Sequence, residues 1–121
     1  MRLLVTGSRD WKKKGIVKRV LISEASSLKK PITLVSGACP SGADKFAEEV
    51  AALYGWEVER HPADWDRYGK RAGLVRNKEM VDLGADVCVA FILNGSRGAA
   101  STADLAEKAG IITLRIIDRG M

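Results

Sequence analysis

The stretch Ile32-Thr33-Leu34-Val35-Ser36 is apolar and β-branched, and it breaks off at Gly37. Residues 41–55 follow after a short loop and carry apolar side chains at helical spacing. A buried strand that leads through a glycine-containing loop into an amphipathic helix is half of a βαβ unit. Ser41 and Asp44, three residues apart, predict a capping box at the start of this helix.

The same alternation of apolar strand and amphipathic helix runs through the rest of the chain. Strands are predicted at residues 3–6, 32–36, 56–60, 86–92 and 111–117. Helices are predicted at about 13–29, 41–55 and 70–83, and from Ser101 or Thr102 to about 110. This order predicts the α/β class, with a single Rossmann-like, doubly wound, parallel five-stranded sheet and helices on both faces, in one domain over residues 1–121. Such sheets bind ligands beyond the carboxyl ends of their strands, where the strand order reverses.

The composition is that of an ordinary soluble protein, with 46% hydrophobic and 29% charged residues and a net charge of +5. No apolar run approaches the ~18 residues that a membrane span needs, and no secretory signal is evident at the start. We therefore expect a cytoplasmic protein with no membrane partner. Cys39 and Cys88 lie far apart and His61 is alone, so we expect neither a metal site nor a cofactor. The basic stretch 12–30 is interpreted mainly as a solvated helix face.

Glycine and small polar residues occupy the loops that follow the predicted strands, at 6–11, 36–44, 61–65 and 94–102. Glycine lets a phosphate approach backbone N–H groups, and the next helix N-terminus adds free N–H groups and a partial positive charge. Loop 94–102 fits an anion best, because glycines, hydroxyl groups and an arginine precede a helix there. Loop 94–102 lacks the Gly-Lys-Ser/Thr of a Walker loop, and loop 6–11 lacks Gly-x-Gly-x-x-Gly, which disfavours hydride transfer.

Four motifs, in order along the chain, resemble one family: Val5–Trp11, Val35–Asp44, Trp65–Asn77 and Gly95–Gly98. They are similar to the YspA-like, cpYpsA-related branch of the SLOG superfamily, which includes the LONELY GUY phosphoribohydrolases and DprA. The resemblance implies a Rossmann-like domain that binds a nucleotide or a nucleotide-derived ligand, as a sensor or a processing factor. It also implies a homodimer, which we expect to form through the helices beside the fourth strand.

The loops and the resemblance together identify the candidate ligand-binding residues. The arginines would supply charge to a phosphate, and Trp65 would stack on a base or close a hydrophobic lid over the sheet edge. The candidates are Gly7, Ser8, Arg9, Gly37, Ala38, Asp44, Asp64, Trp65, Arg76, Asn77, Gly95, Ser96, Arg97, Gly98, Ser101 and Thr102.

Two further functions remain as alternatives. One is a phosphoribohydrolase that releases the base from a nucleoside 5′-monophosphate, with Arg76 and Asp104 as catalytic residues and Asp44 or Asp64 as other candidate carboxylates. In the LONELY GUY enzymes a glutamate ends the glycine-rich loop, and the corresponding position here falls near Ser101 and Thr102. The expected glutamate is therefore missing, which favours binding over catalysis. The other alternative is a DprA-like nucleic-acid-binding module that uses the basic first helix.

Overall fold

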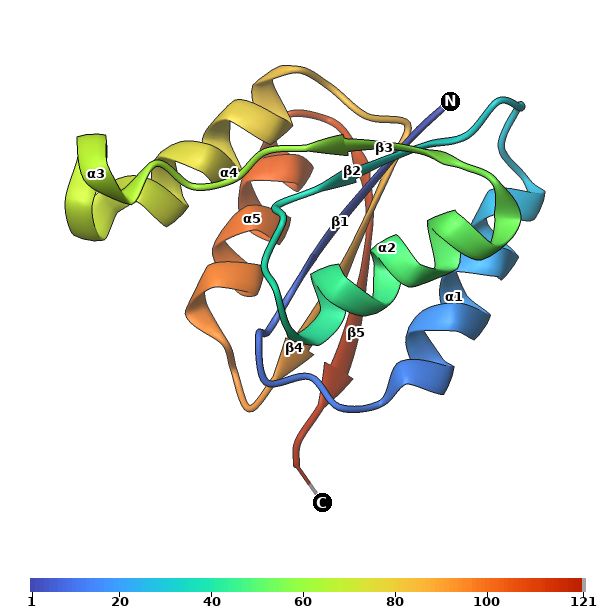
Figure 1. Ribbon diagram of the computed structural model, residues 1–121, viewed down its shortest axis with the longest axis horizontal. Helices are drawn as coiled ribbons and strands as arrows, with labels where there is room; N and C mark the ends of the chain where they lie inside the picture. Colours follow the sequence, from blue (N-terminus) through green and yellow to red (C-terminus); the bar gives the residue numbers. More distant parts are fainter. Residues whose placement is uncertain (121) are drawn as a thin grey trace.

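A computed structural model describes residues 1–120 and contains one parallel sheet of five strands in the order β3-β2-β1-β4-β5 (Figure 1). The strands are β1 (Arg2–Gly7), β2 (Thr33–Ser36), β3 (Glu57–Arg60), β4 (Val87–Leu93) and β5 (Ile112–Asp118). The helices are α1 (Lys14–Ser26), α2 (Gly42–Tyr54), α3 (Trp65–Tyr68), α4 (Ala72–Asp82) and α5 (Arg97–Lys108), with a 3₁₀ turn, η1 (Gly69–Arg71), before α4. The predicted Rossmann-like α/β fold is confirmed, and β3 is an edge strand as expected.

Successive side chains of β1 pack into different hydrophobic cores, one on each face of the sheet. Leu3 joins the core that α1 and α2 build, where Leu21 is also fully buried. Leu4 points the other way, into a second core that includes Met80 from α4 and Ala106 from α5. A strand covered on both faces has no polar side, and this explains why the sequence of β1 is a continuous apolar run.

The strand order reverses beside β1. The chain moves outward from β1 through β2 to β3, then returns to pair β4 with the opposite edge of β1, where Gly7 lies opposite Phe91. The connection after β1 leads to α1 on one face, whereas the connection after β4 leads to α5 on the other (Figure 1). Two chains that diverge in this way leave a crevice between them, so the candidate site falls where the topology predicts it.

The start of the last helix differs from the prediction. Helix α5 begins at Arg97, four residues before Ser101. Asn94 and Gly95 both have positive φ angles, and the tight turn that they form lets the Ser96 N–H donate to the Leu93 carbonyl at 3.0 Å. The turn reverses the chain immediately after β4, so the helix starts early and Thr102 lies in its second turn rather than at its cap.

The predicted capping box at α2 is also absent. The Ser41 hydroxyl donates to the Arg9 carbonyl at 3.1 Å instead of accepting from its own helix. The Asp44 Oδ2 atom accepts from the Cys39 N–H at 3.2 Å instead of reaching back to Ser41. Both side chains serve neighbouring loops, because the loops after β1 and β2 lie against the start of this helix.

Two glycines allow the end of β1 to touch the start of α2. A Cβ atom at Gly7 would overlap the Ala43 side chain, and one at Gly42, where φ is +71°, would overlap the Ser8 carbonyl. This contact lets the Ala43 N–H donate to the Ser8 carbonyl at 3.2 Å. The loop after β1 is therefore fastened to the N-terminus of α2.

Replacing Gly7 by alanine should destabilise the protein by about 1–3 kcal/mol, because α2 must move away from β1 to admit the methyl group. Gly15 in α1 is the control, since a Cβ atom there meets nothing within 4 Å. Gly15→Ala should be neutral or slightly stabilising. Urea unfolding curves of the two variants check this, and equal stability of Gly7→Ala and the parent would refute the close contact.

Candidate functional site

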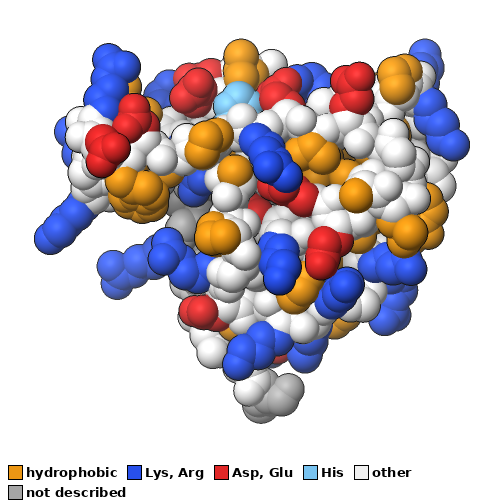
Figure 2. Space-filling view, in the orientation of Figure 1, with side chains coloured by type: hydrophobic (Ala, Val, Ile, Leu, Met, Phe, Trp, Pro, Cys, Tyr) orange, Lys and Arg blue, Asp and Glu red, His pale blue; other side chains and the backbone are white. Residues whose placement is uncertain are grey.

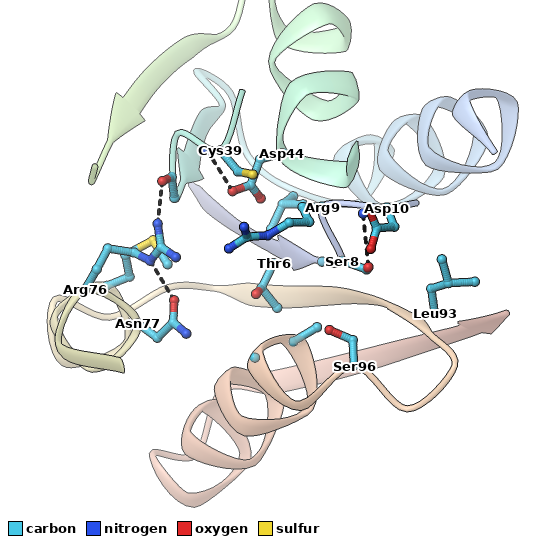
Figure 3. A pocket seen from close by; sticks show the side chains of 16 residues that line it. Thr6, Ser8, Arg9, Asp10, Cys39, Asp44, Arg76, Asn77, Leu93 and Ser96 are labelled. Carbon is cyan, nitrogen blue, oxygen red and sulfur yellow. Dashed lines mark hydrogen bonds between the residues drawn. The ribbon is translucent and has the colours of Figure 1, made fainter. Parts of the chain in front are cut away.

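A cleft of about 370 Å³ opens at the carboxyl edge of the sheet, between the loop after β1, the loop after β2, and helices α4 and α5 (Figure 3). Many of the predicted ligand-binding residues line it: Gly7, Ser8, Arg9, Gly37, Asp44, Arg76, Asn77, Ser96 and Gly98. They come from four separate segments of the chain. The sheet edge therefore brings together residues that are up to 91 positions apart, from Gly7 to Gly98.

The loop after β1 is fixed by its own backbone. The Ser8 carbonyl accepts from the N–H groups of Trp11 and Ala43, both at 3.2 Å, and the Ser8 hydroxyl accepts from the Asp10 N–H at 3.2 Å. The backbone of this loop is thus held, while the Arg9 side chain is exposed at the cleft (Figure 3). A fixed loop that carries an exposed guanidinium can meet an anion with little reorganisation.

Arg76 connects α4 to the loop after β2. Its Nη1 atom donates to the Gly37 carbonyl at 2.5 Å, and its Nε atom donates to the Asn77 Oδ1 atom at 2.7 Å. A Cβ atom at position 37 would lie 2.7 Å from that Nη1, so a larger residue here would displace the guanidinium from its present position. The Nη2 atom has no hydrogen bond to any of residues 1–120, which leaves one edge of the guanidinium available to a ligand.

Asp44 is a buried carboxyl group in the wall of the cleft, with only 6% of its surface exposed. Burial raises the pKa of Asp44 to about 6, and the Cys39 N–H and the Arg76 charge offset this only in part. Its Oδ2 atom accepts from Cys39, but its Oδ1 atom has no hydrogen-bond partner within the described chain. Arg76 does not form a salt bridge with it, because Arg76 is engaged by the Gly37 carbonyl.

The N-terminus of α5 forms the opposite wall. Ser96 is the N-cap residue and its side chain makes no capping hydrogen bond. Counting from the start of the helix, Ala100 is the first residue whose N–H group has a backbone acceptor, the Ser96 carbonyl at 3.1 Å. Gly98 and Ala99 line the cleft, so the N–H end of a twelve-residue helix faces it. Free N–H groups and the helix dipole favour an anion at this wall.

A second hollow of about 320 Å³ adjoins the cleft and shares Arg9, Gly37, Cys39 and Arg76 with it. Its other walls come from the loop after β2 and from the segment before α3, which contribute Ala38, Pro40, Ser41, Pro62, Ala63 and Trp65. Trp65 is 54% exposed, so its ring offers a flat apolar surface at the mouth of this hollow. The shared residues make the two cavities one continuous site with a polar and a less polar end.

Several predicted residues lie outside both cavities. Gly95 and Arg97 are in the turn and first position of α5, and Ser101 and Thr102 are in the next turn, where the Thr102 hydroxyl donates to the Gly98 carbonyl. Asp64 caps α3 by accepting from the Arg67 N–H at 3.1 Å.

Asp104 also lies away from the cleft, because its carboxylate binds Arg115 of β5 at 2.6 Å. The cleft is also lined by residues that were not among the individual candidates, including Thr6, Asp10, Cys39 and Met80. Thr6, Asp10 and Cys39 belong to the predicted loops 6–11 and 36–44, and membership of these loops was the available signal.

Part of the basic stretch around α1 is paired with acidic side chains. Lys13 pairs with Asp118 at 3.1 Å, and Lys14 pairs with Glu49 at 3.5 Å, so part of the basic stretch around α1 is neutralised. Figure 2 shows Lys and Arg side chains scattered among Asp and Glu on this face, with no single basic stripe. This arrangement agrees with a solvated helix face.

Residues 1–120 contain no cluster of three or more His, Cys, Asp or Glu side chains that could hold a metal ion. None of the helices in this part has the length and apolar character to cross a bilayer. Cys39 and Cys88 are both free thiols.

The doubly wound sheet places the protein in the Rossmann-like α/β class, with a cleft at the switch point of the sheet as the candidate site. Residues 1–68 match the YspA, cpYpsA-related SLOG family. The chain is also 41% identical over 123 residues to the Gene 61 protein of Mycobacterium phage D29, with 98% of each chain covered. The protein therefore belongs to the YspA, cpYpsA-related SLOG family. No solved structure matches it.

Replacing Asp44 by asparagine should stabilise the ligand-free protein at neutral pH. The pKa of Asp44 is raised from 3.8 to about 6 by folding, so its ionisation between these values destabilises the native state. The difference corresponds to about 3 kcal/mol at pH 7.5. It should shrink as the pH falls through 6 and vanish only below the pKa of the unfolded carboxyl group, at about pH 3. Urea unfolding of the parent and Asp44→Asn across this range measures it. A gap that does not change with pH would contradict the buried position of this carboxyl group.

Proposed function

We propose that the protein binds a nucleotide or a nucleotide-derived ligand in the cleft at the carboxyl edge of β1, β2 and β4. The observation that carries this proposal is the convergence of the α5 N-terminus with the guanidinium groups of Arg9 and Arg76 on one cavity. Membership of the SLOG family supports it, because that family is associated with nucleotide-related ligands.

The ligand's phosphate binds at the α5 wall in this proposal. The N–H groups of Gly98 and Ala99 donate to phosphate oxygens there, and Arg9 adds charge from the facing loop. The base lies in the adjoining hollow against Trp65, because an exposed indole ring provides a surface for stacking. Arg76 lines both cavities and contacts the middle of the ligand.

Thermal unfolding with AMP, GMP, CMP, UMP and inorganic phosphate tests this function. A ligand at 100 times its Kd should add about 2.7 kcal/mol to the free energy of unfolding, or about 10 °C in Tm. Arg76→Ala and Gly98→Val should each abolish most of the shift in a folded protein. Arg76 is not part of the described hydrophobic cores, and a Cβ atom at Gly98 meets nothing within 4 Å, so the valine fills the cleft rather than the protein interior.

No shift with any of these nucleotides would refute the proposed function. A shift with DNA or RNA oligonucleotides that falls steeply with salt would instead favour the nucleic-acid-binding alternative. If Arg76→Ala or Gly98→Val binds as tightly as the parent, that residue lies outside the binding site.

A phosphoribohydrolase is the second candidate, and Asp44 is the observation in its favour. Of the three carboxylates considered, Asp44 lines the cleft and has a pKa near 6, within reach of acid–base work at neutral pH. Chromatography of the same nucleotide mixtures for free base distinguishes an enzyme from a binding protein. Base release that Asp44→Asn abolishes would identify the enzyme, and no release at high protein concentration would exclude it for these substrates.

We also propose that the protein is a cytoplasmic homodimer. Leu74 and Leu83, near the two ends of helix α4, are 56% and 57% exposed and offer apolar surface on the helix that precedes β4. Light scattering should give the mass of two chains, and Leu74→Lys combined with Leu83→Lys should reduce it to one. A single-chain mass for the parent at high concentration would refute the dimer.

A further inference from the structure

The wall of the cleft contains an acceptor atom without a donor. The Oδ1 atom of Asp44 is buried and has no hydrogen-bond partner among residues 1–120, while its Oδ2 atom is satisfied by the Cys39 N–H. Buried polar atoms in native proteins are nearly always paired, and an unpaired one needs an explanation. Since Asp44 lines the cleft, a bound molecule can supply the missing donor.

The nearby cation does not supply it. Arg76 lies beside Asp44, and a side chain at position 37 would touch both, with 2.7 Å to the Arg76 Nη1 atom and 3.0 Å to the Asp44 Oδ2 atom. Arg76 nevertheless donates to the Gly37 carbonyl and to Asn77. The arginine is held in place by these bonds, and the absent side chain of Gly37 keeps the space before the carboxyl group open.

The atom that meets Oδ1 must be a hydrogen-bond donor, which an ionised phosphate oxygen is not. An ionised carboxylate also repels a phosphate. The anion-binding N–H groups are elsewhere, at the start of α5. Figure 3 shows Asp44 and Ser96 on opposite sides of the cleft, with Thr6 and Arg9 between them in this view.

The position of Asp44 identifies which part of a nucleotide it meets. Asp44 lines the first cavity together with the α5 wall, and its neighbours Gly37, Cys39 and Arg76 also line the second, where Trp65 lies. In a nucleotide the sugar joins the phosphate to the base. A ligand with its phosphate at α5 and its base at Trp65 therefore places its sugar hydroxyl groups near Asp44.

We propose that Asp44 accepts a hydrogen bond from a ribose hydroxyl group through Oδ1, so that the cleft selects ribonucleotides over deoxyribonucleotides. This inference rests on the proposed function, which supplies the phosphate and base positions. Asp44 is then a specificity-determining residue. A site that is built to pair a buried polar group with a hydroxyl group rejects the analogue that lacks it, because the group is then left unpaired.

Isothermal titration of the nucleoside monophosphate that gives the largest thermal shift, with its 2′-deoxy and 3′-deoxy analogues, tests this role. The parent protein should bind the ribonucleotide at least tenfold more tightly than one of the two analogues. In Asp44→Asn this ratio should fall below about threefold. Asp82→Asn at the end of α4 removes an exposed carboxylate that lines neither cavity, with the same change of charge, and it should keep the ratio of the parent.

The outcomes separate the two proposals. Equal binding of the ribonucleotide and both deoxy analogues by the parent overturns the hydroxyl contact and leaves the nucleotide site standing. Binding of no nucleotide overturns both.

A comparison of AMP with IMP tests the other hydrogen-bond donor of an adenine nucleotide, the amino group of the base. If Asp44→Asn removes a preference for this amino group and not for a hydroxyl group, Asp44 faces the base and the inference is wrong. The measurement on the parent decides the matter even if a variant fails to fold.

Discussion

The contact between the end of β1 and the start of α2 determines the rest of the site. Gly7 and Gly42 remove the side chains that would keep these segments apart, and the Ser8 carbonyl then accepts from Ala43 in the first turn of α2. This contact holds the loop after β1 at the crevice. It also fixes the first turn of α2, so that Asp44 lies behind the loop after β2 instead of facing solvent. The packing of β1 against α2 thus sets the positions of the loop after β1 and of the Asp44 carboxyl group.

Arg76 has the complementary role on the other face of the sheet. It belongs to α4, yet its guanidinium reaches the Gly37 carbonyl in the loop that leads to α2. The two helical layers are otherwise separated by the sheet, and this side chain joins them at the carboxyl edge. Because the bond uses Nη1 and Nε, the arginine is oriented while Nη2 remains available, and orientation before binding lowers the entropic cost of capturing a ligand.

Apolar periodicity and βαβ topology were sufficient to predict the fold and the edge at which Gly7, Gly37 and Gly98 meet, whereas Arg76 was assigned to this edge by the family resemblance. Local patterns failed where a distant partner competes for the same side chain. Asp44 resembled half of a capping box but binds Cys39, and Asp104 resembled a catalytic carboxylate but pairs with Arg115. The start of α5 was misplaced because the positive φ angles of Asn94 and Gly95 are not evident from residue type alone. The unpaired Oδ1 atom could be found only from coordinates.

The two ends of the site differ in how they are built into the molecule. The α5 wall is part of a helix that packs on the sheet through Ala99, Ala103 and Ala106, whereas α3 has no buried side chain. Figure 1 shows α3 projecting beyond the sheet. Substitutions in the α3 segment therefore leave the interior undisturbed, whereas changes at the α5 wall also affect folding. Variation in this short peripheral stretch can therefore alter the surroundings of Trp65 while the α5 wall and the packed interior stay as they are.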